Sequence, residues 1–246
     1  MRKLVIFLVL CGCAKSKDAA PAASSSPATG SAAPAPAAPA APAAPAAAAE
    51  PAGDKELTLD QATEGLSKDG KLMAEFVTDQ GSIHCELLPD AAPKTVASFV
   101  GLARGLRPFQ DPATGKWAKQ AFFDGLAFHR VIPQFMIQGG DPLSRTYDDP
   151  RIGSGGPGYT LPDEIAPDLR FDHPGVLAMA NTGPHTHSGG SQFFITEKPY
   201  PSLNGGYVIF GQCQDPEVVQ AIARVQRGSN DKPAQPVTMK VKIYRQ

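Results

Sequence analysis

The sequence predicts one all-β domain, a barrel or a sandwich capped by helices, that begins near residue 57. Short stretches of alternating apolar and polar residues recur from residue 71 onward, each bounded by turn-forming residues such as Gly, Pro, Asn or Asp. Only two stretches in this part carry a good helical spacing of apolar residues. Many short strands with few helices favour a barrel or a sandwich.

The charge balance argues against nucleic acid as a partner. The formal net charge is −1 at pH 7, with 23 basic and 24 acidic side chains. A nearly neutral chain produces no field that attracts a polyanion. We therefore expect no nucleic-acid binding.

Residues 1–13 predict a secretory signal of the bacterial lipoprotein type. A basic start is followed by an unbroken apolar run over residues 4–10, which is too short to span a bilayer. Cys13 follows the small Gly12, as a lipidated cysteine does, and we expect it to carry the lipid and become the mature N-terminus. Cys11 fits less well, because a bulky residue precedes it. The alternative is an ordinary secretory peptide with incidental cysteines.

Residues 14–56 predict a disordered Ala/Pro-rich tether. Residues 14–53 contain 20 Ala and 8 Pro, and no Val, Ile, Leu, Met or aromatic residue. Such a segment buries too little apolar surface to offset its ordering entropy, and its prolines prevent a helix. Lipid, tether and domain together predict an anchored protein of the bacterial cell envelope, on the periplasmic face. Ala14 after the lipidated cysteine favours the outer membrane.

The first half of the domain, residues 57–246, predicts a short helix, a hairpin and a longer helix. A capping box at Thr58 and Gln61 starts a helix that reaches about Leu66. Pro93 opens the longer helix, and Gly105 is a plausible end for it. The other expected elements are strands at 72–78 and 82–88 around a turn at 79–81, and a loop or open hairpin at 109–123.

The second half predicts further strands, one helix and a glycine-rich loop. The expected strands cover 131–132, 175–181, 191–196, 207–210 and 237–244, and the helix covers 215–225. The loop at 153–158 lacks the strand-then-helix frame and the Lys-Ser/Thr pair of a phosphate-binding loop, so we assign it no phosphate.

Arg130 stands out in the apolar stretch 128–142. It precedes two strand-forming residues, and Gln138 follows eight residues later, just before two glycines. An arginine is rarely placed among apolar residues unless it is paired or functional. From the residues alone two interpretations stay open, namely pairing with a carboxylate such as Asp141, or catalysis.

Neither the cysteines nor the histidines of the domain predict a metal site or another cofactor. Strand alternation places Cys85 in the core, and we expect Cys85 and Cys213 to be buried free thiols, since a sequence gives no distance. The alternative is that they form a disulfide in an oxidising compartment. His185 and His187 lie two residues apart, but three or four converging ligands are needed for a metal. We interpret them as part of an exposed turn.

Seven motifs in one order identify a resemblance to the cyclophilins, the peptidyl-prolyl cis–trans isomerases, from about residue 71 to residue 244. The motifs are, in chain order, Pro93-Lys94-Thr95-Val96, Phe128-His129-Arg130-Val131-Ile132-Pro133, Phe135-Met136-Ile137-Gln138-Gly139-Gly140-Asp141, Gly153-Ser154-Gly155-Gly156, Met179-Ala180-Asn181, Ser191-Gln192-Phe193-Phe194-Ile195 and Leu203-Asn204-Gly205. The resemblance implies a closed eight-stranded antiparallel barrel capped by two α-helices. It also implies an isomerase of X–Pro bonds that needs no cofactor.

The resemblance also implies the site. Arg130 matches the family's catalytic arginine. The positions that match its proline pocket are Phe135, Met136, Phe194 and Leu203, and those that line the groove or bond the substrate backbone are Gln138, Ala180, Asn181 and Gln192. Tyr207 stands where many members have His, and it still presents a ring edge and a polar tip.

Two departures from the family pattern concern the groove. Ser202 replaces a tryptophan that helps better-known members bind cyclosporin, so we expect reduced sensitivity to the drug. The turn at 184–190 is one residue longer, which can reshape the substrate entrance.

The expected partners are proline-containing unfolded or partly folded polypeptides, bound by a monomer. The expected function is X–Pro isomerisation that assists the folding of exported or envelope proteins. The alternative is a proline-peptide binding or chaperone module in which isomerisation is incidental.

Overall fold

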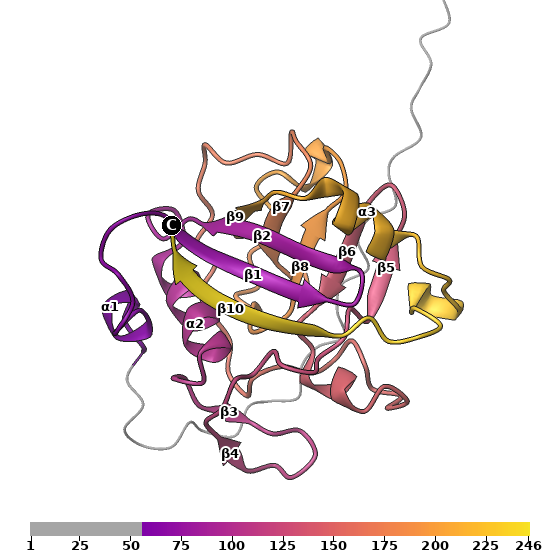
Figure 1. Cartoon of the computed structure of the whole chain (residues 1–246), viewed down its shortest axis with the longest axis horizontal. Helices are drawn as coiled ribbons and strands as arrows, with labels where there is room; N and C mark the ends of the chain where they lie inside the picture. Colours follow the sequence, from indigo (N-terminus) through magenta and orange to yellow (C-terminus); the bar gives the residue numbers. More distant parts are fainter. Residues whose placement is uncertain (1–55) are drawn as a thin grey trace, which may run out of the picture. The chain divides into compact units, whose positions relative to one another are not determined.

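The computed structural model describes residues 56–246, and within them the chain forms ten β-strands, three α-helices and three short 3-10 helices (Figure 1). The strands are β1 (Leu72–Thr78), β2 (Gly81–Leu87), β3 (Phe109–Gln110), β4 (Trp117–Ala118), β5 (Arg130–Ile132), β6 (Met136–Gly139), β7 (Val176–Met179), β8 (Phe193–Thr196), β9 (Ile209–Cys213) and β10 (Met239–Arg245). The helices are α1 (Leu59–Ala62), α2 (Pro93–Ala103) and α3 (Pro216–Ala223), with the 3-10 helices η1 (Pro142–Arg145), η2 (Pro201–Leu203) and η3 (Ser229–Asp231).

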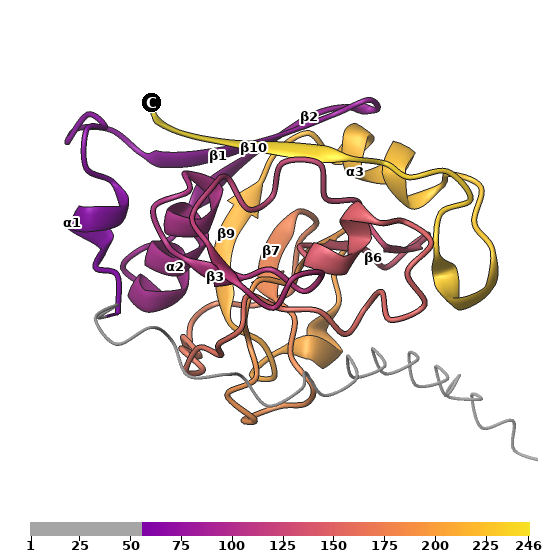
Figure 2. The ribbon, with the colours of Figure 1, turned by 90° about the horizontal axis from the view of Figure 1, so that it is seen from below.

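Eight of the strands form one antiparallel sheet, in the order β10-β1-β2-β9-β7-β8-β6-β5. Figures 1 and 2 show β10, β1 and β2 side by side, and these three strands form one end of the sheet. The chain just before β5 meets the chain leading into β10, since Ala127 and Thr238 form an isolated bridge. The Phe128 N–H also donates to the Val237 carbonyl at 3.0 Å. The eight antiparallel strands predicted from the resemblance are therefore present, and a short bridge joins the two edges of the sheet.

The two longer helices begin where the sequence predicted. Proline occupies the first turn of both α2 and α3, where its missing N–H is not needed. The capping residue of α2, Ala92, has no side-chain acceptor. Instead, Glu164 accepts from the backbone N–H groups of Lys94 and Thr95 at 3.0 and 2.8 Å. A carboxylate from a distant loop therefore satisfies the free donors of this helix start.

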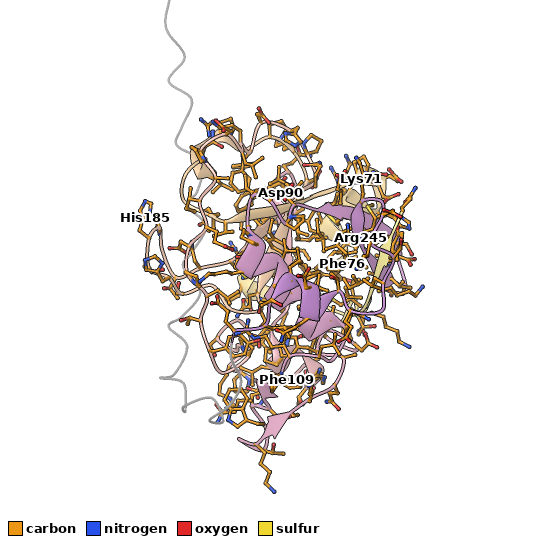
Figure 3. All side chains as sticks on the ribbon, turned by 90° about the vertical axis from the view of Figure 1, so that its left-hand side faces the viewer. Lys71, Phe76, Asp90, Phe109, His185 and Arg245 are labelled. Atoms are coloured by element: carbon orange, nitrogen blue, oxygen red, sulfur yellow. A yellow bond between two sulfur atoms is a disulfide. The ribbon has the colours of Figure 1, made fainter. Side chains whose placement is uncertain are left out.

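An aromatic cluster fills the space between the sheet and α2. Phe76 of β1 packs against Phe99 of α2 and Phe193 of β8, with ring centroids 5.9 and 5.0 Å apart. Phe99 also contacts Phe123 and Phe210, at 4.9 and 5.3 Å. Figure 3 shows Phe76 within the body of the domain. Rings of this size dominate the apolar surface that folding removes from water.

The first helix is shorter than predicted, and the segment predicted as a loop or an open hairpin forms a hairpin. The capping box at Thr58 and Gln61 is present, but α1 ends at Ala62 rather than Leu66. Gly65 adopts φ 79°, a left-handed conformation that does not continue a helix. The segment 109–123 does contain a hairpin, formed by β3 and β4.

The expectation of free thiols at Cys85 and Cys213 was wrong, because the two residues form a disulfide. They are register partners in the antiparallel pair of β2 and β9. Alternation correctly placed Cys85 in the core, where it is fully buried. The distance to Cys213 depends on the pairing of two strands 128 residues apart in the chain, which only the fold decides.

The predictions for residues 1–13, including lipidation of Cys13, and for the tether up to residue 55 lie outside the described residues. Between residues 56 and 246, no helix has the length and apolar character needed to cross a membrane.

We expect the disulfide to stabilise the domain by about 2–5 kcal/mol, because it closes a loop across a 128-residue separation and restricts the unfolded chain. Urea unfolding with and without reductant, followed by fluorescence, measures this difference. The double variant Cys85→Ala/Cys213→Ala serves as the control, since reductant should not alter its midpoint. Equal stability of the oxidised and reduced protein would contradict the expectation.

Candidate active site

The site is built on rows of residues that run across the sheet. Arg130 on β5 is the register partner of Gln138 on β6, and Gln138 in turn faces Phe194 on β8. Phe194 pairs with Ala178 on β7. Since directly paired residues share a face of a sheet, these four side chains lie on the same face. The eight-residue spacing of Arg130 and Gln138 is thus the result of a tight turn between paired strands.

The neighbouring row faces the opposite way, into the main core. It contains Val131, Ile137, Ile195 and Leu177, all of them 0% exposed. Alternation along each strand therefore supplies one face to the core and the other to the candidate site.

A chain of amide hydrogen bonds links the sheet to the glycine-rich loop. The Arg130 Nη1 donates to Gln138 Oε1 at 3.4 Å, and Gln138 Nε2 donates to Gln192 Oε1 at 3.0 Å. Gln192 Nε2 then donates to the carbonyls of Gly153 and Gly155, at 3.0 and 2.8 Å. Each side-chain amide uses both its donor and its acceptor, so the orientation of the groove wall is specified.

Asp141 also anchors the glycine-rich loop. Its buried carboxylate accepts from the backbone N–H groups of Leu143, Gly153 and Gly155. Burial raises the pKa of Asp141, and these three donors act against that rise. A side chain at Gly155 would collide with the Asp141 carboxylate, which explains the glycine. Asp141 is therefore a loop anchor. The interpretation that Arg130 faces a carboxylate is confirmed, but Asp141 was the wrong candidate for that carboxylate.

The carboxylate that faces Arg130 belongs to Asp231 of η3. Its Oδ2 lies 3.8 Å from the Arg130 Nε, and the Arg130 side chain is 15% exposed. Burial lowers the pKa of Arg130, while the charges of Asp231 and Tyr207 act against that change. A guanidinium keeps its proton under such conditions, so Arg130 is a largely buried cation with one nearby anion.

A second apolar cluster lies beside Arg130 and is separate from the main core. The structure brings together the five apolar residues predicted for the groove in one buried cluster: Phe135, Met136, Ala180, Phe194 and Leu203. The Tyr207 ring meets Phe194 edge-to-face at 5.2 Å. Arg130 lies in the same row of the sheet as Phe194, with Gln138 between them, which places the cation beside this cluster.

Asn181 and Ala180 border the opposite end of the site. The Ala180 N–H donates to the Gln192 carbonyl at 2.9 Å, which joins the two segments. The Asn181 side chain donates to the Gly206 carbonyl at 2.8 Å and accepts from the Gly183 N–H at 3.2 Å. A cavity here is lined by Ala180, Asn181 and Gln192, together with parts of the segments 154–160 and 188–191. The ten predicted site residues within the domain are therefore connected through the strand row, the amide hydrogen bonds, the apolar cluster and this cavity.

Sequence reasoning missed three contributors. Phe171 stacks on Phe194 at 5.9 Å, and Tyr200 packs against Phe135 at 4.4 Å. Asp231 completes the surroundings of Arg130. Phe171 and Asp231 come from segments without a strand pattern, and Tyr200 precedes a 3-10 helix, so no periodicity marked them. The Phe171 N–H donates to Asn204 Oδ1 at 2.8 Å, and this bond joins two of these irregular segments.

The lengthened turn at 184–190 lies beside this region. His185 and His187 both adopt a positive φ, and both are exposed. Figure 3 shows His185 at the outer edge of the domain. The His187 Nδ1 accepts from the Asp163 N–H at 3.0 Å, which attaches the turn to a neighbouring loop. In the part of the chain that the structure describes, no group of three or more His, Cys, Asp and Glu residues is arranged to hold a metal ion.

The sequence and the fold match a known class of protein. The family model described as cyclophilin type peptidyl-prolyl cis-trans isomerase/CLD matches residues 73–243. The chain therefore belongs to the cyclophilin-type peptidyl-prolyl cis–trans isomerases, and it is an enzyme that interconverts the cis and trans forms of X–Pro bonds.

Bacterial relatives are similar over most of their length. Peptidyl-prolyl cis-trans isomerase A of Mycobacterium tuberculosis is 46% identical over 169 residues, which cover 68% of this chain and 88% of the relative. Peptidyl-prolyl cis-trans isomerase B of Streptomyces anulatus is 48% identical over 156 residues, which cover 62% and 84%.

A solved structure supports the same fold. A cyclophilin-type isomerase of Cryptosporidium parvum aligns with a TM-score of 0.58 and 31% identity, over 72% of this chain and 99% of its own. The same protein crystallised in the presence of the dipeptide Ala-Pro aligns with a TM-score of 0.54.

His129, the neighbour of Arg130, makes stability depend on pH. Burial, followed by the charge of Arg130, lowers the pKa of His129 to about 4, and Gln192 acts against this. An unfolded histidine has a pKa near 6.5, so between about pH 6.5 and 4 the unfolded chain binds a proton that the folded chain does not. We expect His129 to lower the free energy of unfolding by up to about 3 kcal/mol as the pH falls through this window.

Urea unfolding of the wild type and His129→Gln at pH 7, 5.5 and 4 measures this contribution. The variant should lose less stability than the wild type on acidification, and the exposed-site control His185→Gln should match the wild type. Identical acid sensitivity of all three proteins would refute the assignment to His129.

Proposed function

We propose that this enzyme isomerises X–Pro bonds of exported or envelope proteins and thereby assists their folding, with Arg130 as its catalytic residue. The observation that carries the proposal is the position of Arg130, a largely buried cation in the same row of the sheet as Phe194 of the separate apolar cluster, which we interpret as the proline pocket. An apolar pocket suits a proline ring, and a neighbouring fixed cation suits the amide beside it.

The reaction needs little beyond this arrangement. Rotation about an X–Pro bond breaks amide resonance, with a barrier of about 18–20 kcal/mol, but no covalent bond forms or breaks. The enzyme has to bind the twisted amide more tightly than either planar form. Raising a rate of roughly 10⁻² s⁻¹ to roughly 10³ s⁻¹ requires about 7 kcal/mol.

Arg130 supplies stabilisation that grows with the twist. Twisting localises a lone pair on the proline nitrogen and makes that nitrogen a better acceptor. A guanidinium at this nitrogen, or at the adjacent carbonyl, gains strength as the twist develops. Because Arg130 is largely buried, water screens its charge less than it would at the surface.

The remaining site residues divide the substrate into a held part and a rotating part. In our proposal the pocket of Phe135, Met136, Phe194 and Leu203 binds the proline ring, with Tyr207 at its edge. The amides of Gln138, Asn181 and Gln192 and the backbone of Ala180 bind the peptide backbone. The Cryptosporidium relative studied with Ala-Pro supports a proline-containing peptide as the substrate.

Three features support action outside the cytoplasm. The lipoprotein-like signal at residues 1–13 and the tether up to residue 56 suit a domain anchored at the periplasmic face of a membrane, which Ala14 suggests is the outer membrane. The disulfide between Cys85 and Cys213 suits an oxidising compartment, since cytosolic thiols are kept reduced.

Arg130→Ala should lower kcat/KM by two to three orders of magnitude, because the transition state loses its charged donor. Peptide affinity should change by less than about fivefold, since the pocket remains. A protease-coupled assay and NMR exchange on an Ala-Pro peptide measure both quantities. Phe135→Ala is the complementary variant, which should mainly weaken binding. Near-normal turnover of Arg130→Ala would exclude the proposed catalytic role of Arg130.

Cys13→Ser should release the protein from membranes in a bacterium that processes lipoproteins, because it removes the expected lipid attachment. Detergent partitioning and intact mass follow the lipid, and Cys11→Ser is the matched control that should stay anchored. An unchanged mass and partitioning of Cys13→Ser would rule out lipidation there.

A further inference from the structure

The guanidinium of Arg130 is oriented by two partners on different elements. Its Nη1 faces Gln138 Oε1 at 3.4 Å, and its Nε faces Asp231 Oδ2 at 3.8 Å. Together they restrain a side chain with four rotatable bonds, and they leave Nη2 without a hydrogen bond among the described residues. Preorganised donors are what electrostatic catalysis requires.

Asp231 is itself held in place by a second arginine. Its Oδ1 accepts from Arg227 Nη1 at 2.6 Å, while its Oδ2 faces Arg130. The two oxygens of one carboxylate therefore point at two cations. Because Arg227 neutralises the negative charge of Asp231, Asp231 does not neutralise the positive charge of Arg130, which stays available to a substrate amide.

Arg227 connects this pair to the strand that carries Arg130. The same Nη1 donates to the Val131 carbonyl at 3.2 Å, and Val131 is the residue after Arg130 in β5. The brace formed by Arg227 and Asp231 thus starts and ends on β5, and a movement of the loop relative to the strand would break one of its contacts.

The backbone at Asp231 has a conformation that glycine usually occupies. Asn230 and Asp231 adopt φ of 60° and 59°, a left-handed conformation that favours glycine and that Asn and Asp tolerate best among the others. The surrounding loop is closed by the Gly228 N–H donating to the Lys232 carbonyl at 2.8 Å, and by Ala234 donating to Gln226 at 2.7 Å. Glycine would suit the backbone at least as well, but it would supply no carboxylate.

We propose that Asp231, held by Arg227, is a positioning residue that keeps the Arg130 guanidinium oriented toward the substrate amide. The inference rests on the proposed role of Arg130. The brace should raise kcat rather than affinity, because it acts on the group that stabilises the twisted amide and touches no part of the apolar pocket.

The test compares Asp231→Gly with Asn230→Gly in the full-length protein. Both substitutions place glycine at a left-handed position of one loop, and only the first removes the carboxylate. We expect Asp231→Gly to lower kcat about tenfold on an Ala-Pro peptide with KM changed less than twofold, and Asn230→Gly to retain wild-type kinetics. Asp231→Asn removes the charge with little change of shape, and it should also lose severalfold in kcat.

A double-mutant cycle with Arg130→Ala separates positioning from a general effect on the loop. In the Arg130→Ala background, Asp231→Gly should cause no further loss of kcat. In the Asp231→Gly protein, which keeps Arg130, the NMR signal of the Arg130 Nε–H should shift and exchange faster with water. Equal losses in both backgrounds, or wild-type kcat in both Asp231 variants, would overturn this inference. A fully active Arg130→Ala would overturn the proposed function instead, and the inference with it.

Discussion

The site depends on the antiparallel register of β5 and β6. That pairing places Arg130 opposite Gln138 and continues as one row through Phe194 to Ala178. Because side chains alternate between the two faces of a strand, a slip of one residue would send Arg130 into the core and expose Val131. The main core resists such a slip, since Val131 and its partners Ile137 and Ile195 are fully buried.

The domain contains two apolar clusters with different roles. The larger one, centred on the contacts of Phe99 with Phe76, Phe123, Phe193 and Phe210, holds the sheet to α2. The smaller one lies on the opposite face of β6, β7 and β8 and contains the residues proposed to bind the proline ring. Phe193 and Phe194 are neighbours in sequence but belong to different clusters. A rigid core on one face can therefore support a binding surface on the other.

Irregular segments contribute to the site together with the sheet. Buried carboxylates anchor several of them by accepting backbone N–H groups, as Asp141 does for the glycine-rich loop. Glu197 does the same for the turn before Phe135, where it accepts from the Gln134 N–H at 2.7 Å and from Arg224 at 2.6 Å. Such bonds are worth more than bonds between neutral groups, because the acceptor is charged. Loops without regular structure are thereby held firmly enough to form a groove wall.

The sequence by itself determined most strands of the large sheet, the starts of the two longer helices and the family, because these depend on local alternation, on capping residues and on motifs in a set order. It also singled out Arg130, since an arginine in an apolar run is conspicuous. It did not predict β6 (Met136–Gly139) as a strand. Only the tertiary structure decided that Asp231 rather than Asp141 faces Arg130, that Cys85 and Cys213 are bonded, and that Phe171 and Tyr200 pack in the smaller apolar cluster. Each of these contacts joins segments that lie far apart in the chain, and no local pattern encodes the distance between them.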